Sequence, residues 1–527
     1  MPDFDSCITT PSNAISLLLS IAIVYYISLG FYRLFLCPVA RVPGPFLGKI
    51  TYCYEFYHDV IRGGQYTFIL PELHRKYGPI VRINPHEVHI SDPEFYDLLY
   101  TGTHKKRDKW SWFTDAFGIP DSTFSAEKHD VHRVRRAALN PYFSKAKVRS
   151  LQPQIEHVVN KLLDRFAGFR KTGEPIPMSL AFAALTNDIA MQYAFGRNEK
   201  RIEAENFDPS FHDASVAGSV ASHLIKQFPW ILSTMQSLPD SVVVKLSPDM
   251  GSYVKMQSDI RHQINLIQAD PHKKNSTSDK AQETIFHQIL NSDLPAQEKS
   301  MSRLWQDGQV TVLAGTITTA AALSFALYHI LDQPTITRKL KEELGTVMKD
   351  KDAFPPSTAL EQLPYFTGCI KEALRLSNGV SHRLQRISPN EPIIFEDKST
   401  RKQMVIPPGT PMSMTGYLIH MDPALFENPK EFNPQRWLDN PRLDRYLVAF
   451  SRGTRQCLGM NLGYAELYLT LAGIFRRYGT KDVRFPEDEG YIELFETDHR
   501  DVEIAADFVI PLAYKGSKGV RVVVHDF

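Results

Sequence analysis

The chain has 527 residues, of which 43% are hydrophobic and 23% charged, an ordinary balance for a globular protein. A net charge of +1 gives neither the basic surplus expected for nucleic-acid binding nor an acidic tail. The five cysteines, at 7, 37, 53, 369 and 457, include no C-x-x-C pair. This pattern indicates neither a structural zinc site nor a disulfide framework, and it favours a reducing compartment.

The first predicted element is a membrane-spanning helix. Residues 14–32 are uncharged and mostly apolar, which is long enough for a helix to cross a bilayer core of about 30 Å. A cleaved signal peptide is the alternative, but acidic residues rather than a basic cluster precede the run. Arg33, Arg41 and Lys49 follow it. The positive-inside rule then predicts that the carboxyl-terminal bulk lies in the cytosol.

A proline-rich segment follows the predicted helix. Residues 38–46 contain three prolines, and proline fixes φ and interrupts both helices and sheets. We therefore predict an anchor at 1–37, with its helix at about 14–36. The segment 38–46 is the predicted hinge, and 47–527 is the predicted catalytic domain.

Beyond the hinge, helical patterns dominate over short strand patterns. Residues 80–90 predict a β-hairpin, strand-like clusters recur at 384–414 and 509–524, and the polar segment 270–283 predicts an exposed loop. The expected fold class is mainly α with small peripheral β-sheets. Helices are predicted at 128–138, 148–168, 179–195, 253–269, 302–330, 335–349 and 459–477.

The predicted helix 302–330 is unusually apolar, which favours burial through the core. It contains the segment AGTITT, from Ala314 to Thr319. A glycine and three threonines in a buried helix favour a local bulge or kink. Simple packing of small residues is the alternative.

Two other helical segments carry charges whose roles the residues alone leave open. His132 and Arg136 lie in a basic stretch that could be a solvated helix face. A metal pair of His129 and His132 lacks the H-E-x-x-H pattern. Glu372 and Arg375 share a helix face, which by itself indicates only an ordinary ion pair.

The segment FSRGTRQCLG predicts a heme thiolate at Cys457. Phe450 can cover the sulfur, Gly453 permits a tight turn, and Gly459 lets the following helix approach a porphyrin closely. Backbone N–H groups at the start of that helix would stabilise a thiolate. Arg455 can reach a carboxylate at the porphyrin edge. The alternative is a buried, inert cysteine.

This segment resembles the signature F-x-x-G-x-R-x-C-x-G of the cytochrome P450 monooxygenases, with every fixed position present. The resemblance extends over nearly the whole chain. It implies a cytochrome P450 fold after one transmembrane helix, with heme b as cofactor and Cys457 as the axial ligand of its iron. The chain has no G-x-G-x-x-G motif, so electrons are expected from a separate NADPH-cytochrome P450 reductase, with cytochrome b5 as a second candidate donor.

The resemblance also implies roles for the charged segments. Glu372 and Arg375 would form a buried network with Arg436 of the segment FNPQRW, behind the heme. This network would serve folding and heme retention rather than chemistry. The heme propionates would be bound by Arg136, His132, Arg386 and Arg455, with His132 standing where the family carries tryptophan.

On the opposite side of the heme, Ala314 and Gly315 would leave room for dioxygen. Thr318 falls on the family's threonine that guides protons to the bound oxygen. Family members often carry an acid just before this threonine, where this chain has Ile317. That departure leaves water with Thr318, another polar group or a reaction with less proton delivery as alternatives. His420, a lone histidine, is interpreted as structural.

Substrate walls follow only by family position. The segments KYGPIVRINPHEVHISDPEFY and HQILNSDLP are similar to fungal microsomal enzymes of the trichodiene oxygenase group. The implied function is hydroxylation or epoxidation of a lipophilic terpenoid, polyketide or alkaloid by a single-pass protein of the endoplasmic reticulum membrane. The expected walls are Trp110–Phe124, Phe228–Trp230, Gln309–Leu313, Gly379–His382 and Phe495–Thr497.

Two other functions remain open. A heme-thiolate isomerase or dehydratase would need no reductase, and Ile317 favours it slightly. A non-catalytic heme-binding membrane protein is disfavoured by Gly315 and Thr318, which match the oxygen site of the family.

Overall fold

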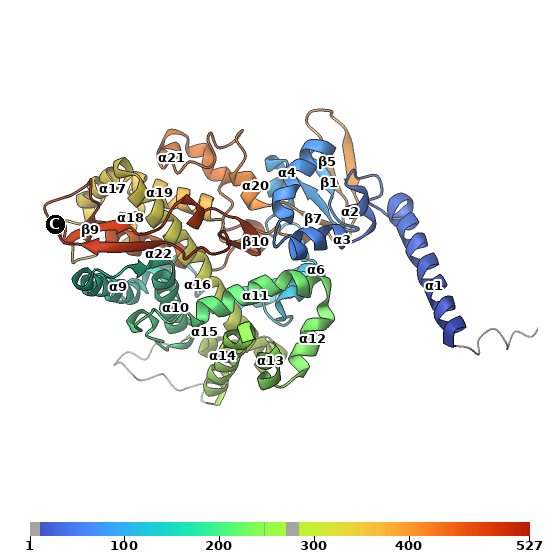
Figure 1. The fold of residues 1–527 in the computed structure, drawn as a ribbon, viewed down its shortest axis with the longest axis horizontal. Helices are drawn as coiled ribbons and strands as arrows, with labels where there is room; N and C mark the ends of the chain where they lie inside the picture. The colour runs from blue at the N-terminus through green and yellow to red at the C-terminus, as the bar shows by residue number, and fades with distance from the viewer. Residues whose placement is uncertain (1–10, 247, 270–283) are drawn as a thin grey trace, which may run out of the picture.

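A long central helix, α16 (Met301–Asp332), organises the fold of the computed structural model, which describes residues 11–246, 248–269 and 284–527. It packs against α10 (Met178–Phe195), α19 (Pro364–Ser377), α14 (Gly251–Ala269) and α22 (Met460–Arg477). Figure 1 shows α16 passing through the middle of the helical body. The prediction of a buried core helix at 302–330 is therefore confirmed. The predicted loop 270–283 lies outside the described residues.

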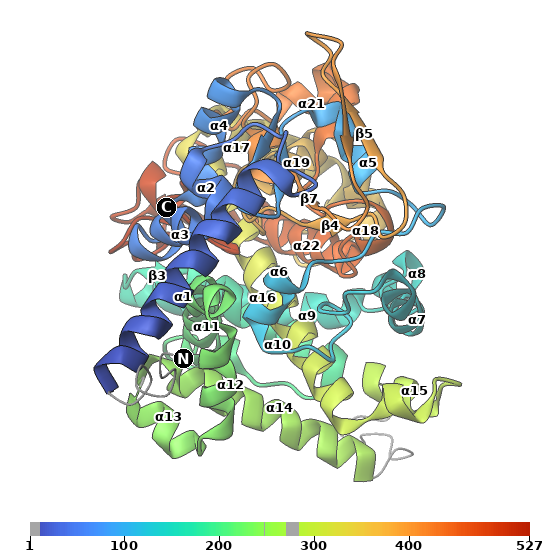
Figure 2. The ribbon, with the colours of Figure 1, turned by 90° about the vertical axis from the view of Figure 1, so that its right-hand side faces the viewer.

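The predicted helices all exist, with ends displaced by a few residues. Helix α16 is α-helical from end to end, so the bulge expected around Gly315 does not form. Figures 1 and 2 place α12 to α14 at the opposite end of the molecule from α21. The other helices are α2 (Phe46–Ile50), α3 (Cys53–Phe56), α4 (Tyr66–Tyr77), α5 (Tyr96–Leu99), α6 (Ser111–Thr114), α7 (His129–Leu139), α8 (Lys145–Arg149), α9 (Gln152–Thr172), α11 (Ser210–Gln227), α12 (Pro229–Ser237), α13 (Asp240–Leu246), α15 (Ile285–Asn291), α17 (Pro334–Val347), α18 (Ser357–Glu361), α20 (Gly416–His420) and α21 (Gln435–Asp439).

Four small sheets lie around this body, and their strand orders are β1-β2-β7-β4, β3-β12-β9-β8, β5-β6 and β10-β11. The predicted hairpin at 80–90 is confirmed, since Ile80 pairs with Ile90 in antiparallel register. The fold class, mainly α with small sheets, is confirmed as well. The strands are β1 (Ile80–Arg82), β2 (Val88–Ile90), β3 (Ile176–Pro177), β4 (Arg386–Ile387), β5 (Ile393–Glu396), β6 (Gln403–Ile406), β7 (Pro411–Ser413), β8 (Tyr478–Gly479), β9 (Gly490–Leu494), β10 (Ala506–Phe508), β11 (Ile510–Leu512) and β12 (Arg521–His525).

Helix α1 (Pro11–Phe31) projects away from the body and continues as a π-helical turn, Tyr32–Leu36 (Figure 1). The segment Ser12–Leu36 has a mean hydropathy of 2.1 and is apolar and long enough to cross a membrane. Its side chains are not covered by the rest of the protein. Helix α16 is also long and apolar enough, but half of its most apolar stretch is buried inside the protein. We conclude that α1 is consistent with a membrane anchor and that α16 is a core helix.

The proline-rich segment after the anchor is docked on the body. Val39 and Val42 are buried in an apolar cluster with residues of β2 and β7. The Arg82 backbone N–H donates to the Pro43 carbonyl over 2.7 Å. A side chain at Gly44 would collide with the Arg82 backbone. The segment predicted as a hinge therefore packs tightly on strand β1.

Candidate active site

The cysteine loop is a tight turn closed by backbone contacts. The Cys457 N–H donates to the Phe450 carbonyl over 2.9 Å. Gly453 has a φ of 73°, and a Cβ there would collide with the Thr101 backbone. Only glycine fits both conditions without strain. The Phe450 ring packs against Tyr464 of α22, with ring centroids 5.2 Å apart.

Helix α22 begins directly after this loop, at Met460. Burial raises the pKa of the Cys457 thiol, while the N–H groups of Gly459 and Met460 and the charge of Arg136 oppose this rise. Cys457 also keeps exposed surface. The raised pKa shows that the surrounding protein desolvates the thiol, although part of its surface is accessible. A Cβ at Gly459 would meet no atom within 4 Å, so the space beside the helix start is open, as a porphyrin requires.

Three buried cations, Arg455 of this loop with Arg386 and Lys109, lie close together. The Arg455 guanidinium donates to the carbonyls of Ala126 and Glu127 over 2.6 and 2.7 Å. Burial and the nearby Arg386 lower the pKa of Arg455 to about 9. Burial, Arg455 and Arg386 hold the pKa of Lys109 well below its usual value. Like charges placed together in a desolvated site destabilise one another unless an anion joins them.

Lys109, Arg386 and Arg455, and also Arg136, form none of the ion pairs in the described part of the chain. A ligand with two carboxylates matches this cluster, and heme carries two propionates. The chain's residues therefore fit the implied cofactor.

The other predicted propionate residues differ in position and charge. Arg136 lies near Cys457, and its Nε donates to Asn140 Oδ1 over 2.8 Å. His132 is buried, and burial together with Arg455 and Lys109 lowers its pKa to about 2. His132 is therefore neutral at pH 7, so it can offer a hydrogen bond but no positive charge. Lys109, which no sequence motif marked, supplies a buried charge next to Arg455.

Helix α16 carries the residues predicted to lie on the other side of the heme. The Thr318 hydroxyl donates to the Ala314 carbonyl, one turn earlier, over 2.8 Å. Ala314 is exposed toward the interior space and Gly315 faces Ala190 of α10, whose Cβ would lie 3.5 Å from a Cβ at 315. A Cβ at Gly379 would lie 3.0 Å from Thr318 Cβ. The segment after α19 is thus pressed against Thr318.

A second group behind this helix escaped the sequence analysis. Glu466 of α22 is fully buried, one of its oxygens has no hydrogen-bond partner, and a hydrogen bond links it to Thr319. Burial raises the pKa of the Glu466 carboxyl well above its usual range, which favours its protonated form. Glu466 is thus an acid in contact with Thr319, the residue after Thr318, in a helix that has Ile317 at the position of the usual acid.

Behind the cysteine loop, the structure brings together Glu372, Arg375 and Arg436. Glu372 accepts from Arg375 over 2.7 and 3.0 Å, from Arg436 over 3.0 Å and from the Trp437 indole over 2.8 Å. All of these side chains are buried. A buried carboxylate that is fully hydrogen-bonded holds its partners rigidly.

His420 joins this network to the cysteine loop. Its Nδ1 lies 2.7 Å from Asn378 Oδ1, and its Nε2 accepts from the Val448 N–H over 2.9 Å. Burial lowers the pKa of His420 to about 3. Both ring nitrogens are occupied in protein contacts, which suits a structural residue, and Val448 lies two positions before Phe450.

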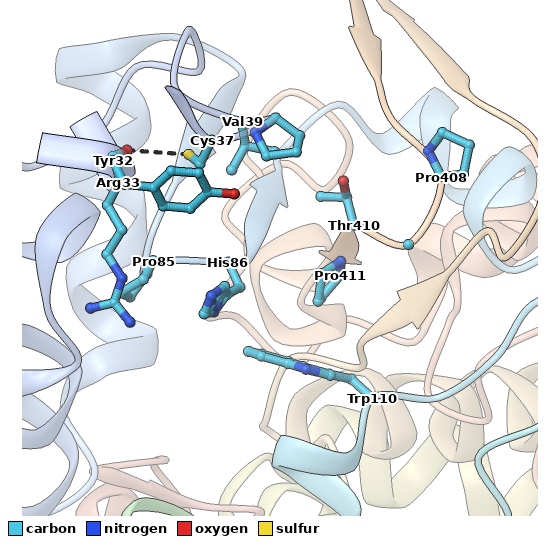
Figure 3. Close-up of a pocket in the computed structure, with 12 residues that line it drawn as sticks. Tyr32, Arg33, Cys37, Val39, Pro85, His86, Trp110, Pro408, Thr410 and Pro411 are labelled. Carbon is cyan, nitrogen blue, oxygen red and sulfur yellow. Dashed lines mark hydrogen bonds between the residues drawn. The ribbon is translucent and has the colours of Figure 1, made fainter. Parts of the chain in front are cut away.

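A cavity lies elsewhere in the molecule, as Figure 3 shows. It has a volume of about 430 Å³ and lies where the anchor meets the body, between Arg33, His86, Trp110 and Pro411. None of its lining residues belongs to the cysteine loop or to α16. It shares Trp110 with the predicted substrate walls.

Comparison with known proteins agrees with this arrangement. The family model described as "Cytochrome P450" matches residues 45–489. The cytochrome P450 monooxygenase tpcC of Cochliobolus heterostrophus is 50% identical over 517 residues, covering 98% of each chain. The tryptophan 6-hydroxylase fscE of Fusarium equiseti is 40% identical over 501 residues, with 94% of each chain covered. The N-acetyltryptophan 6-hydroxylase ivoC of Emericella nidulans is 38% identical over 514 residues, with 96% of each covered.

The family model spans most of the chain, and the relatives align over nearly their full lengths. The chain therefore belongs to the cytochrome P450 family, as a monooxygenase whose cofactor is heme b.

Proposed function

We propose that the protein hydroxylates or epoxidises a lipophilic small molecule, with dioxygen and with electrons from NADPH through a separate reductase. The observation that supports this most is that Cys457, directly before helix α22, keeps accessible surface close to a cluster of buried cations. Two relatives are named as hydroxylases, so hydroxylation is the first reaction to test.

The chain's own residues would divide the work. Cys457 would ligate the iron, while Arg386, Arg455, Arg136 and Lys109 would hold the propionates. Bound heme supplies oxygen activation, which the thiolate ligand promotes. Thr318 would hold a proton at its hydroxyl, which now donates to the Ala314 carbonyl.

Aromatic side chains would exclude water from the substrate site beside the heme. Phe113, Phe117 and Phe124 form a contiguous cluster, with neighbouring ring centroids 5.1 and 5.2 Å apart. Lys109 Nζ lies 3.7 Å from the centre of the Phe124 ring. A substrate wall that runs from the cations to these rings favours an apolar or aromatic substrate.

We also propose a location at the endoplasmic reticulum membrane, with the catalytic domain in the cytosol. The apolar segment Ser12–Leu36 supports anchoring, and Arg33, Arg41 and Lys49 support the orientation by the positive-inside rule. Protease treatment of intact microsomes should then digest the body and leave only a short anchor fragment. Full protection of the body would contradict the orientation.

The test of the reaction is an omission assay. Microsomes containing the protein and a reductase are incubated with tryptophan, N-acetyltryptophan or an extract of a producing fungus, and products are identified by mass spectrometry. We expect a product heavier by one oxygen atom, formed only when NADPH and reductase are both present. A product formed without NADPH would instead support the isomerase or dehydratase alternative.

A further inference from the structure

Asp507 is a buried carboxylate at which separate parts of the chain meet. It lies on strand β10 and is fully buried. Its Oδ1 accepts from the Ser381 hydroxyl over 2.8 Å and from the Val509 N–H over 3.0 Å. Its Oδ2 accepts from the Thr67 hydroxyl over 2.5 Å and from His382 Nδ1 over 2.9 Å. Each carboxylate oxygen therefore has two donors, which is the full complement expected of a buried carboxylate.

The Asp507 backbone extends these connections. Its N–H donates to the Gly64 carbonyl over 2.9 Å, and its carbonyl accepts from His223 Nε2 over 2.6 Å. His223 lies on α11. Asp507 thus ties together α4, α11, the segment after α19 and the hairpin of β10 and β11. These segments are far apart in sequence, and a single residue fixes their relative positions.

The hairpin is held in a strained conformation at its turn. Val509 has a φ of 72°, and a β-branched residue in this region is a genuine outlier. Its N–H is bound by Asp507, and its carbonyl accepts from the Ser381 N–H over 3.0 Å. Strain of this kind persists only where the surroundings enforce it, and it concentrates at functional sites.

The residues that Asp507 holds are next to the proposed reaction site. Ser381 and His382 follow Gly379, which is pressed against Thr318. The His382 ring stacks on Phe113, with centroids 5.5 Å apart and planes 5° apart. Phe113 begins the aromatic cluster that ends at Lys109 and the propionate cations. Asp507 therefore holds residues of the wall that extends from Thr318, through His382 and Phe113, to these cations.

A metal ion is the other occupant to consider, because His223, His382 and Asp507 offer ligand atoms within 4.8 Å of one another. The hydrogen bonds argue against it. All four acceptor positions of the Asp507 carboxylate are used, and His223 Nε2 and His382 Nδ1 already donate to Asp507. Burial lowers the pKa of His382 to about 4, while Asp507 opposes that effect. The ring is therefore neutral at pH 7 and donates through Nδ1–H.

We propose that Asp507 is a positioning residue for substrate selection. It fixes His382, and through the stack on Phe113 it sets the shape of the substrate wall, while Val509 is locked at the hairpin turn. This inference rests on the proposed function only in that a bulky apolar molecule enters the space beside Thr318. It requires no particular reaction and no reductase.

The test is ligand binding to the full-length, heme-loaded protein. Two probes that ligate the heme iron are compared by difference spectroscopy: imidazole, which is small, and clotrimazole, a triphenylmethyl imidazole that must contact the walls. In Asp507→Asn, the clotrimazole dissociation constant should rise at least about fivefold, while that for imidazole stays within about twofold. Neither measurement needs NADPH, so a failure here is distinct from a failure of the proposed reaction.

A matched control separates positioning from general destabilisation. Asp488 is also a buried carboxylate, paired with Lys341 over 2.6 Å in the segment between β8 and β9. Asp488→Asn should lower the melting temperature without changing the ratio of the two dissociation constants. Thr67→Val removes one donor to Asp507 from outside the wall, and it should weaken clotrimazole binding selectively by about twofold. This variant serves if Asp507→Asn does not retain heme.

The proposal is overturned if Asp507→Asn or Thr67→Val leaves the ratio of the two dissociation constants unchanged. It is equally overturned if Asp488→Asn shifts this ratio as much as Asp507→Asn does.

Discussion

Lys109 is a buried lysine whose positive charge is destabilised in the heme-free protein. It is buried beside Arg386 and Arg455, which both lower its pKa, and Arg386 also lowers the pKa of Arg455. Two propionates between them would turn this repulsion into attraction. Removing the charge should therefore affect the heme-free and heme-loaded forms in opposite directions.

We predict that Lys109→Met stabilises the heme-free protein and weakens heme retention. A lost charged hydrogen bond of about 1.5–3 kcal/mol corresponds to heme loss roughly ten times faster or more. Heme transfer to an acceptor globin measures this rate, and thermal unfolding of the heme-free protein measures the stability. Lys105→Met, at a side chain that is 43% exposed, is the control and should change neither. Equal heme retention in Lys109→Met and the parent would contradict the assignment.

Thr318 carries the second prediction at the scale of single residues. Its hydroxyl donates to the Ala314 carbonyl, and Ile317 beside it cannot carry a proton. We expect Thr318→Ala to keep its heme but to release peroxide, lowering product formed per NADPH by at least about tenfold. Thr316→Ala is the control, because Thr316 is buried against Asn187 of α10 on another face of the same helix. Unchanged coupling in Thr318→Ala would show that proton delivery does not pass through this hydroxyl.

At the scale of elements, Glu372 joins α19 to α21 behind the cysteine loop. Glu372→Gln would leave two buried arginines without their carboxylate, at a cost of about 3–5 kcal/mol. We predict a lower melting temperature and a protein that is recovered largely without heme. Asp444→Asn, which breaks the more exposed pair with Lys371, should cost less than about 1 kcal/mol. Similar losses in the two variants would show that the buried network has no special role.

The elements that the sequence predicts well are those with long periodic patterns. Helix α16 is apolar over its whole length, and the hairpin of β1 and β2 alternates around a turn. Helix α11 was missed because its small and polar residues give a weak pattern. The prediction of a bulge near Gly315 was wrong, because the Thr318 hydroxyl donates to the Ala314 carbonyl within a continuous α-helix.

At the scale of the whole molecule, the candidate site is assembled from residues that no local pattern connects. The cysteine loop carries a motif, and the residue types within it predict heme ligation. Lys109 lies on a loop without a motif, and its role emerges only from its buried neighbours. Arg383 and Glu55 pair across 328 residues, and Asp507 meets Thr67 across 440. Such long-range pairs depend on the complete fold, so a single sequence does not reveal them.

The anchor and the body also meet at this scale. The segment after α1 is docked on the body through buried valines, and α1 leaves the body on the side of α2 and α3 (Figure 1). The cavity of about 430 Å³ lies at this junction (Figure 3).

The heme assignment depends on Cys457 acting as a thiolate ligand of the iron. The most direct test is the absorption spectrum of the reduced, carbon-monoxide-bound protein, recorded for the parent and for Cys457→His. We predict that the parent shows the long-wavelength band of thiolate-ligated heme, and that Cys457→His either loses heme or shows the shorter-wavelength band of histidine ligation. An unchanged thiolate band in Cys457→His, or a parent that binds no heme, would contradict the account.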